Sequence, residues 1–313
     1  MAELNNKATR EAYGEFLVEY GEERKDLVVM NADLSGSNKT NGFEAAYPER
    51  FIECGISEQD MMGEAAGIAH SGHVVAASSF TMFAAGRGFE VIRNSIAHTN
   101  ANVKVCATHA GVTVGEDGAT HQTIEDIAIM RTMPGMTVLN PADANSAKVL
   151  LRQLFDMNGP AYARLSRSGM PQVYDVDAAE KLKLGSGAVV REGKDVSIIA
   201  TGLMVSTAIE AAERLAEEDI DARVIDMHTI KPLDRKIILE AAVETGAIVT
   251  AEEHSVIGGL GAAVAEVVVQ NCPVPMQLVG IKDTFGESGK PAELLKRYGL
   301  TADDIVDAVK KLK

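Results

Sequence analysis

The sequence predicts an α/β fold of two consecutive domains, each built on a parallel sheet with helices on both faces. Short apolar runs rich in β-branched residues alternate with longer helix-like stretches along the chain, which is the pattern of parallel strands joined by crossover helices. Runs such as Val196–Ala200 are almost continuously apolar, as expected for strands buried on both faces. A chain of 313 residues, 46% of them hydrophobic, is also long enough for two cores.

The elements follow one another in strand–helix order. The expected strands are Leu27–Asn31, Val74–Ser78, Val103–Thr108, Thr137–Asn140, Ala161–Leu165, Val196–Ala200, Ala222–Asp226, Ala247–Ala251 and Val274–Gly280. The expected helices are Ser57–His70, Ala84–His98, Ile124–Thr132, Ala142–Phe155, Val205–Glu217, Leu233–Thr245, Gly261–Val269 and Pro291–Tyr298. The segment Thr301–Lys313 should close the fold as an amphipathic helix, because Thr301 can cap an acidic first turn and lysines end the segment.

A domain boundary is expected near residues 174–193. This stretch is polar and rich in glycine and has no strong hydrophobic period, which is typical of a connection rather than of a core element. We therefore expect a first domain at residues 1–175, a linker at 176–192 and a second domain at 193–313.

Composition narrows the function classes. The formal net charge of -15 disfavours nucleic acid and anionic membranes as partners, so an anionic substrate would need a local group of cations. The sequence has no apolar stretch of transmembrane length and no secretory signal pattern, which favours a cytoplasmic protein. Cys54, Cys106 and Cys272 are far apart and lack CxxC spacing, so small buried hydrophobes are expected rather than a disulfide framework or zinc site.

Two segments carry candidate residues, an acid at a helix start and a pair of phenylalanines that could form a flat wall for a ring. Glu58 lies in the first turn of a predicted helix, where an acid commonly complements the helix dipole but could also serve a ligand. Phe80 and Phe83 are three residues apart in SSFTMF, so they can share one face of a helix start. The alternative for this pair is ordinary core packing.

Two further segments could bind polar groups. The loop THAGVTVGEDGATHQ carries His109, Glu116, Asp117 and His121 after an apolar strand, and loops at strand ends are where α/β proteins place ligand sites. Metal binding is one interpretation, but the spacing matches no closed zinc pattern, and hydroxyl binding with proton transfer is favoured. Arg167 follows another strand, where it could contact phosphate or simply lie on the surface.

Taken together, these segments resemble the transketolase family, specifically its pyrimidine-binding and C-terminal domains. GEDGATHQTIED is similar to the family's GEDGPTHQ element, GISEQDMMGEAAGIA to its glutamate segment, and SSFTMF to its aromatic segment. The resemblance covers essentially the whole chain, and the segments occur in the family's order.

The resemblance implies a thiamine-diphosphate site. Glu58 matches the glutamate that hydrogen-bonds the pyrimidine ring and favours its imino tautomer, while Phe80 and Phe83 match the aromatic residues that stack on the ring. Asp33 matches an acid near the thiazolium. The family's third aromatic residue is replaced by Gly86, so the ring pocket is looser or is filled from elsewhere.

The resemblance also implies a site for a sugar phosphate. Asp117 and His121 match residues that bind hydroxyls of the donor sugar, and His121 could relay protons. The group that matches the family's phosphate-binding set is Arg10, Ser37, His109 and Arg167. These four residues would form the local cationic site that an acidic chain requires.

The part of the family that is missing is equally informative. The GDG…Asn element that binds Mg²⁺ and the diphosphate does not occur in this sequence. The resemblance therefore implies that both are held by a separate subunit carrying the N-terminal half, in a heterotetramer of two copies of each chain.

Three functions remain open at this point. The first is a transketolase subunit that moves a two-carbon ketol unit between sugar phosphates, as in the pentose phosphate pathway. The second is a related enzyme half, either 1-deoxyxylulose-5-phosphate synthase-like or a 2-oxoacid dehydrogenase β subunit. The third is a non-catalytic scaffold or regulatory partner.

Overall fold

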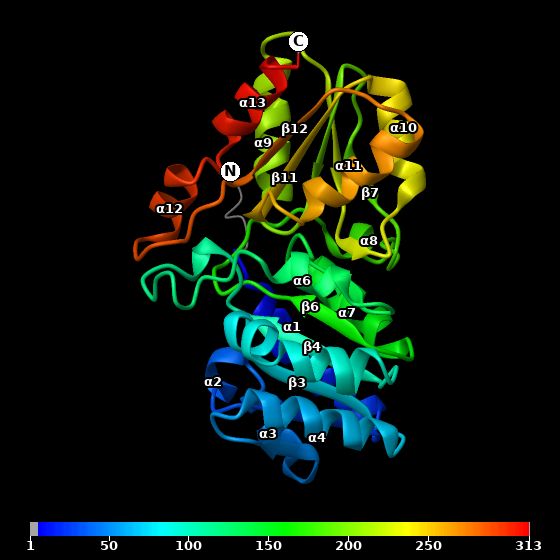
Figure 1. Ribbon diagram of the computed structural model, residues 1–313, viewed down its shortest axis with the longest axis vertical. Coiled ribbons are helices and arrows are strands. Elements are labelled where there is room, and N and C mark those ends of the chain that lie inside the picture. The colour runs from blue at the N-terminus through cyan, green and yellow to red at the C-terminus, as the bar shows by residue number, and fades with distance from the viewer. Residues whose placement is uncertain (1–5, 313) are drawn as a thin grey trace.

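The computed structural model describes residues 6–312, which form two α/β domains stacked along the longest axis (Figure 1). The sheet of the first domain has seven strands, and six of them run parallel to their neighbours. In spatial order these strands are β10 (Thr229–Lys231), β5 (Thr137–Leu139), β6 (Ala161–Arg164), β4 (Val103–Thr108), β3 (Val74–Phe80), β1 (Leu27–Asn31) and β2 (Phe51–Glu53).

The sheet of the second domain has five strands, four of them mutually parallel. In spatial order they are β12 (Met276–Ile281), β11 (Ile248–Ser255), β8 (Val196–Ala200), β9 (Ala222–Asp226) and β7 (Ala188–Arg191). The predicted α/β class with two consecutive sheets is thus confirmed, and all nine predicted strands are present with shifts of at most a few residues at their ends.

Each sheet also has an antiparallel edge strand that the sequence analysis missed. β10 pairs antiparallel with β5, so a segment of the second domain extends the first domain's sheet. β7 pairs antiparallel with β9 and, together with α8 (Val176–Ala179), lies in the expected linker 176–192. Both edge strands are short, and such strands leave little periodic signal.

Helices cover both faces of each sheet, and the strand side chains alternate between them. In the first domain Val74 and Ala76 face the core under α1 (Thr9–Glu23), α3 (Asn41–Ala46) and α7 (Ala144–Asp156). Val75 and Ala77 face the core under α4 (Glu58–His70) and α6 (Asp126–Thr132). In the second domain, α9 (Met204–Ala216) and α13 (Ala302–Lys310) cover one face, and α10 (Arg235–Thr245) and α11 (Leu260–Asn271) cover the other.

One predicted helix has a different internal geometry. In place of a regular helix over Ala84–His98, the chain forms π-helical turns at η2 (Met82–Arg87) and η3 (Ile92–Ala97), with α5 (Phe89–Val91) between them. Such wide turns are uncommon and frequently occur at functional sites. The smaller elements are α2 (Ser35–Asn38), α12 (Pro291–Arg297) and the 3₁₀ turns η1 (Pro48–Arg50) and η4 (Val112–Val114).

The closing helix is confirmed as α13. The Thr301 hydroxyl accepts the backbone N–H of Asp304, and the Asp304 carboxylate accepts the backbone N–H of Thr301. This reciprocal pair is a capping box. Of the cysteines, Cys106 is buried as expected, whereas Cys54 and Cys272 are half-buried. Among residues 6–312, no helix combines the length and apolarity needed to cross a bilayer.

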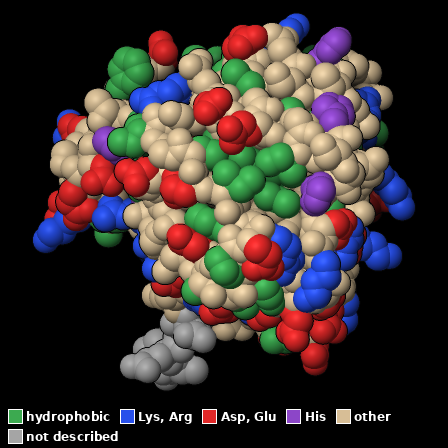
Figure 2. All heavy atoms as spheres, turned by 90° about the horizontal axis from the view of Figure 1, so that it is seen from below, with side chains coloured by type: hydrophobic (Ala, Val, Ile, Leu, Met, Phe, Trp, Pro, Cys, Tyr) green, Lys and Arg blue, Asp and Glu red, His purple; other side chains and the backbone are tan. Residues whose placement is uncertain are grey.

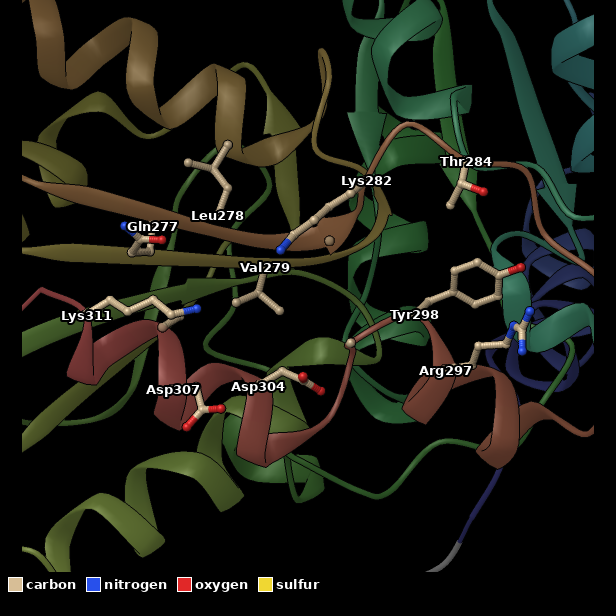
Figure 3. Close-up of a pocket in the computed structure, with 13 residues that line it drawn as sticks. Gln277, Leu278, Val279, Lys282, Thr284, Arg297, Tyr298, Asp304, Asp307 and Lys311 are labelled. Carbon is tan, nitrogen blue, oxygen red and sulfur yellow. The ribbon is translucent and has the colours of Figure 1, made fainter.

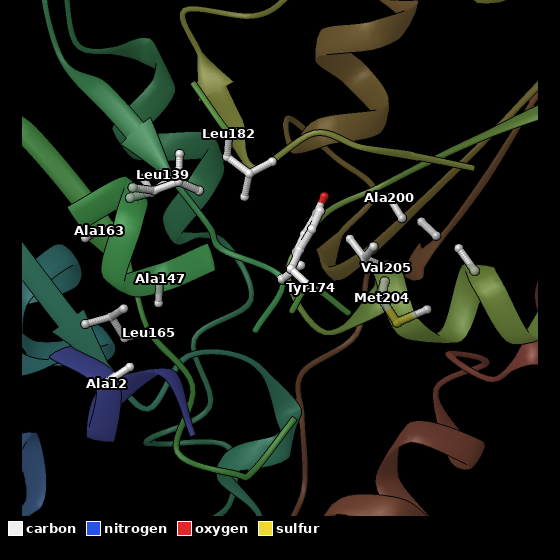
Figure 4. Close-up of a cluster of buried hydrophobic side chains, with 14 of the residues drawn as sticks. Ala12, Leu139, Ala147, Ala163, Leu165, Tyr174, Leu182, Ala200, Met204 and Val205 are labelled. Atoms are coloured by element: carbon white, nitrogen blue, oxygen red, sulfur yellow. The ribbon is translucent and has the colours of Figure 1, made fainter. Parts of the chain in front are cut away.

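Tyr174 joins the two domains through its ring and its hydroxyl. Figure 4 shows the ring between the side chains of Leu139 and Leu182 on one side and Met204 and Val205 on the other. The hydroxyl donates to the buried carboxylate of Asp226 at 2.8 Å. The core is therefore continuous from one domain to the other, so the domains are held in a fixed relation.

The Asp226 carboxyl should make stability depend on pH. Burial raises its pKa to about 7, whereas an unfolded Asp titrates near pH ~3.9. Between these values the folded chain retains a proton that the unfolded chain has released. The contribution of this retained proton to the free energy of unfolding is therefore fully present below pH ~4 and is lost as the pH rises through ~7.

We expect Asp226→Asn to become progressively more stable relative to wild type over this pH range. Urea unfolding at several pH values from 4.5 to 8 measures the difference in unfolding free energy. The exposed Asp177→Asn controls for the change of acid to amide. A difference that stays constant with pH would contradict the assignment.

Candidate active site

The predicted site residues gather where parallel strands end. β6, β4, β3 and β1 are neighbours in the first sheet, so the segments that follow them emerge at one edge. This is the edge at which α/β proteins bind ligands. Arg167 follows β6, His109 follows β4, Phe80 ends β3 and Ser37 follows β1. Arg10 reaches the same place from the first turn of α1.

Glu58 is a buried carboxylate at the start of α4. Its side chain is 2% exposed, although it occupies the first turn of a helix, where acids are usually solvated. Ser79 donates its hydroxyl to Oε1 at 3.4 Å, and Arg87 donates Nη1 to Oε2 at 2.7 Å. The long contact to Oε1 leaves that oxygen only weakly satisfied, so it can accept a further donor.

Aromatic rings stand beside this carboxylate. The rings of Phe80 and Phe83 are nearly parallel, with an interplanar angle of 21° and centroids 6.2 Å apart. The imidazole of His121 meets Phe83 edge-on at 5.3 Å, and that of His109 lies over Phe80 at 3.8 Å. Both phenylalanines are half-buried, so they present a partly open apolar wall rather than a closed core.

Arg10 and His109 form the start of a hydrogen-bonded chain. Arg10 Nη1 lies 3.3 Å from Nε2 of His109, and because a guanidinium can only donate, Nε2 must accept. The proton is then on Nδ1, which donates to the Thr108 hydroxyl at 2.8 Å, and that hydroxyl donates to Oδ1 of Asn38 at 2.6 Å. Burial, reinforced by Arg10, Arg167 and His121, lowers the pKa of His109 to about 3. His109 is therefore neutral and orients Arg10 in this arrangement.

Arg10 also contacts Ser37, but through the backbone. Its Nη1 donates to the Ser37 carbonyl at 2.9 Å. Its Nε is buried and has no partner among residues 6–312, and burial lowers the pKa of the guanidinium. A buried, unpaired N–H on a cation is costly, so this position favours an anionic ligand.

Arg167 crosses from the end of β6 to the polar loop. It donates to the carbonyl of Val114, and its Nη1 lies 3.7 Å from the Glu116 carboxylate and 3.9 Å from that of Asp117. The exposed Asp117 is thereby held beside the cationic group. Nearby, His121 Nδ1 lies 3.0 Å from the Thr120 hydroxyl.

Asp33 is the predicted residue that the structure does not join to this group. Within residues 6–312, no hydrogen bond, ion pair or ring contact links its side chain to the others. The Asp33 backbone N–H donates to Glu53 at 2.6 Å. Asp33 and His109 both have left-handed backbones, with φ of 56° and 61°. Such strain in non-glycine residues is concentrated at functional sites.

A methionine lies at the position of the missing third aromatic residue. A Cβ added at Gly86 would lie 2.9 Å from Cε of Met82, so the Met82 side chain already covers this position. A flexible thioether fills irregular apolar space well. Whether the ring pocket is looser or is filled from elsewhere stays a prediction.

Arg87 is the functional candidate that the sequence reasoning missed. Its guanidinium binds Glu58 and also lies 5.1 Å from the centre of the Phe83 ring. A planar group that donates N–H to this carboxylate and lies against this ring resembles an aminopyrimidine in both contacts. The available signal was its spacing of four residues from Phe83, which places the two side chains on one helix face.

A cavity in the second domain is separate from this group. It has a volume of about 350 Å³ and lies between β12 and α13. Figure 3 shows Lys282 and Lys311 with Asp304 and Asp307 around it. None of the predicted site residues lines this cavity. Within residues 6–312, no three His, Cys, Asp or Glu side chains are grouped as metal ligands.

The fold and this group of side chains define the class of protein. It is a two-domain α/β protein whose sheet edge combines a buried carboxylate, an aromatic wall and paired arginines. Such a set fits a planar ring with a basic nitrogen, next to a phosphorylated or otherwise anionic molecule.

The chain belongs to the transketolase family. Residues 5–172 match the family model for the transketolase pyrimidine-binding domain, and residues 185–305 match that for the transketolase C-terminal domain. Membership implies dependence on thiamine diphosphate, and the buried carboxylate and ring wall fit the aminopyrimidine of this cofactor.

Individual relatives support the assignment. The chain is 47% identical over 304 residues to a putative transketolase C-terminal section of Methanocaldococcus jannaschii, covering 97% of this chain and 95% of the relative. It is 42% identical to a 6-deoxy-6-sulfo-D-fructose transketolase subunit of Clostridium sp. (strain MSTE9), covering 96% and 92% of the two chains. A solved structure described as a split gene transketolase, inactive beta4 tetramer, superposes with a TM-score of 0.91 at 53% identity, covering 97% of this chain and 98% of that one.

Proposed function

We propose that this chain is the C-terminal subunit of a split, thiamine-diphosphate-dependent transketolase. It would transfer a two-carbon ketol unit from a ketose phosphate to an aldose phosphate, and only together with a separate subunit carrying the N-terminal half. The observation that carries this proposal is the buried Glu58 carboxylate beside Phe80 and Phe83, next to the Arg10 and Arg167 group.

The residues have distinct proposed roles around the cofactor. When bound, thiamine diphosphate supplies the nucleophilic carbon for carbon–carbon bond chemistry. Glu58 shares a proton with a ring nitrogen, and Phe80 and Phe83 hold the ring by stacking. Arg87, which binds Oε2 of Glu58 and lies over the Phe83 ring, would compete with the cofactor ring for that aromatic face. Asp33 stays a proposed neighbour of the thiazolium.

The substrate is held by the polar group at the sheet edge. Arg10 and Arg167 bind the substrate phosphate, with Ser37 and His109 positioning Arg10. Asp117 and His121 bind sugar hydroxyls, and His121 also relays a proton. The relative named as a sulfofructose transketolase subunit suggests that a sulfonate could replace the phosphate at such a site.

The partner subunit is proposed to hold Mg²⁺ and the diphosphate, because this sequence has no GDG element. Figure 2 shows hydrophobic side chains exposed near the centre of the face at the far end of the first domain, among charged ones. Ile56, two residues before Glu58, is 74% exposed. An exposed apolar side chain so close to Glu58 in the sequence suits burial against another chain, as in the proposed heterotetramer of two copies of each subunit.

Reconstitution tests the proposal. The chain is mixed with its N-terminal-half partner, thiamine diphosphate, Mg²⁺, xylulose 5-phosphate and ribose 5-phosphate, and ketol transfer is measured. Unphosphorylated sugars and 6-deoxy-6-sulfofructose are run in parallel to test the anion site. Absence of transfer with every sugar phosphate would refute the function.

A second candidate is retained within the same superfamily. Decarboxylation of pyruvate with glyceraldehyde 3-phosphate as acceptor would identify a 1-deoxyxylulose-5-phosphate synthase-like half. The proposed phosphate-binding set and the GEDGATHQ string argue against a 2-oxoacid dehydrogenase β subunit. The complete set of chemistry-bearing residues argues against a scaffold.

A further inference from the structure

The loop that carries Asp117 and His121 is fixed from the second domain. It leaves β4, passes through η4 and returns to α6, and Figure 1 shows α12 of the second domain next to it. The backbone N–H of Thr113, within η4, donates to Oε1 of Glu253 at 2.7 Å. Glu253 belongs to β11, the strand next to the edge of the second sheet.

The Glu253 side chain is buried and packs closely against the loop. Glu253 is only 5% exposed. A Cβ added at Gly111 would lie 2.3 Å from the carboxyl carbon of Glu253. Gly111 has a φ of 79°, so the loop needs glycine there both for its backbone and for the room taken by the carboxylate. The carboxylate is therefore packed against the beginning of the loop as well as bonded to it.

Other bonds attach the same loop to the same domain. The Gln122 side chain donates to the carbonyl of Glu287 at 2.8 Å and to that of Gly115 at 2.9 Å. The Ser288 hydroxyl donates to the carbonyl of Glu116 at 2.7 Å, immediately before Asp117. Both ends and the middle of the loop thus depend on the second domain for their position.

We propose that Glu253 is a positioning residue, and that the second domain serves through it to hold the sugar-binding loop at the sheet edge. The inference rests on the proposed function for its kinetic consequence, although the attachment of the loop can be tested without activity. Glu253 contacts neither Glu58 nor the phenylalanine wall in any measured interaction. Loss of its carboxylate should therefore affect sugar binding and leave cofactor binding intact.

The test compares variants of the assembled two-subunit enzyme. In Glu253→Ala, the KM for both sugar phosphates should rise about tenfold, as for loss of a hydrogen bond to a charged group, while thiamine diphosphate binds as in wild type. Glu253→Gln keeps an acceptor oxygen and should restore the KM to within about twofold. The exposed Ser288→Ala, which poses no risk to folding, should raise the KM about two- to threefold.

Glu252→Ala is the matched control. Glu252 is the neighbouring buried carboxylate, but it accepts the backbone N–H groups of Leu260 and Gly261 at the start of α11. Its loss should lower stability without changing the sugar KM. An equal rise in KM in Glu252→Ala, or a parallel loss of cofactor affinity in Glu253→Ala, would overturn the proposal.

Amide hydrogen exchange separates this inference from the proposed function. Residues 109–122 should exchange faster in Glu253→Ala than in wild type, whereas α4 should be unchanged. If the wild-type complex transfers no ketol unit, the proposed function fails, but faster exchange still supports the attachment. Unchanged exchange in both Glu253→Ala and Ser288→Ala would refute the positioning role.

Discussion

Replacing Glu58 by alanine is expected to lower turnover of the assembled enzyme by about 10²–10⁴-fold, the usual contribution of a positioned proton-transfer group. The Glu58 carboxylate, at the start of α4, is buried next to the ring wall and accepts a hydrogen bond from Ser79 at the end of β3. Its loss removes the group that we propose shares a proton with the cofactor ring. The α4 helix and its packing on the sheet remain, so assembly with the partner should persist.

Steady-state ketol transfer and size-exclusion chromatography of the same preparation provide the measurement. Asp60→Ala is the matched control, because Asp60 is an exposed acid in the same first helical turn. It removes the same helix-dipole contribution without touching the site. Turnover in Glu58→Ala that matches Asp60→Ala would support a scaffold or a structural role for the acid.

The strands could be predicted because burial on both faces leaves an unmistakable apolar run. β1, β4, β8 and β9 have the predicted bounds. The edge strands β7 and β10 could not be predicted, since their pairing depends on which neighbour the folded chain brings to them. The π-helical turns at Met82–Arg87 differ from an α-helix in which backbone carbonyl each N–H bonds, five residues back rather than four. Tertiary packing decides between the two, so the sequence pattern does not show it.

The site residues likewise fall into those that the sequence indicated and those that only tertiary contacts reveal. Phe80 and His109 were found because they follow apolar strands within distinctive strings, and the structure brings them into contact. Arg87 was missed because its ion pair with Glu58, 29 residues away in the sequence, becomes evident only in three dimensions. Glu253 had a weak signal, namely two acids and a histidine within an otherwise apolar strand. A buried charge in such a run indicates a bond to another part of the fold.

The interface that holds Glu253 contains an ion pair that is buried on both sides, between Arg164 and Asp126. Arg164 is 5% exposed and donates Nε to the fully buried Asp126 at 2.8 Å. Its Nη2 donates to the backbone carbonyl of Glu253 at 2.9 Å. Tyr162 gives its hydroxyl to the same Asp126 oxygen at 2.7 Å. Burial raises the pKa of Glu253, and the charge of Arg164 opposes that rise, so one guanidinium compensates two buried acids across the domain junction.

Arg164→Met is expected to lower the free energy of unfolding by about 3–5 kcal/mol, because it leaves an uncompensated charge in the interior. Urea unfolding at pH 8 measures the loss. Arg152→Met is the matched control. Its pair with Glu23 is exposed on both sides, so it should change stability by about 1 kcal/mol or less.

The double variant Arg164→Met with Asp126→Asn distinguishes the cause of the loss. Removing the second charge should recover much of the stability, since replacing both partners of a buried pair costs far less than removing one. If the double variant were as unstable as Arg164→Met, lost packing rather than the unpaired carboxylate would explain the effect. The apolar core around Tyr174 would then hold the two domains together, and the ion pair would only fix how they are aligned.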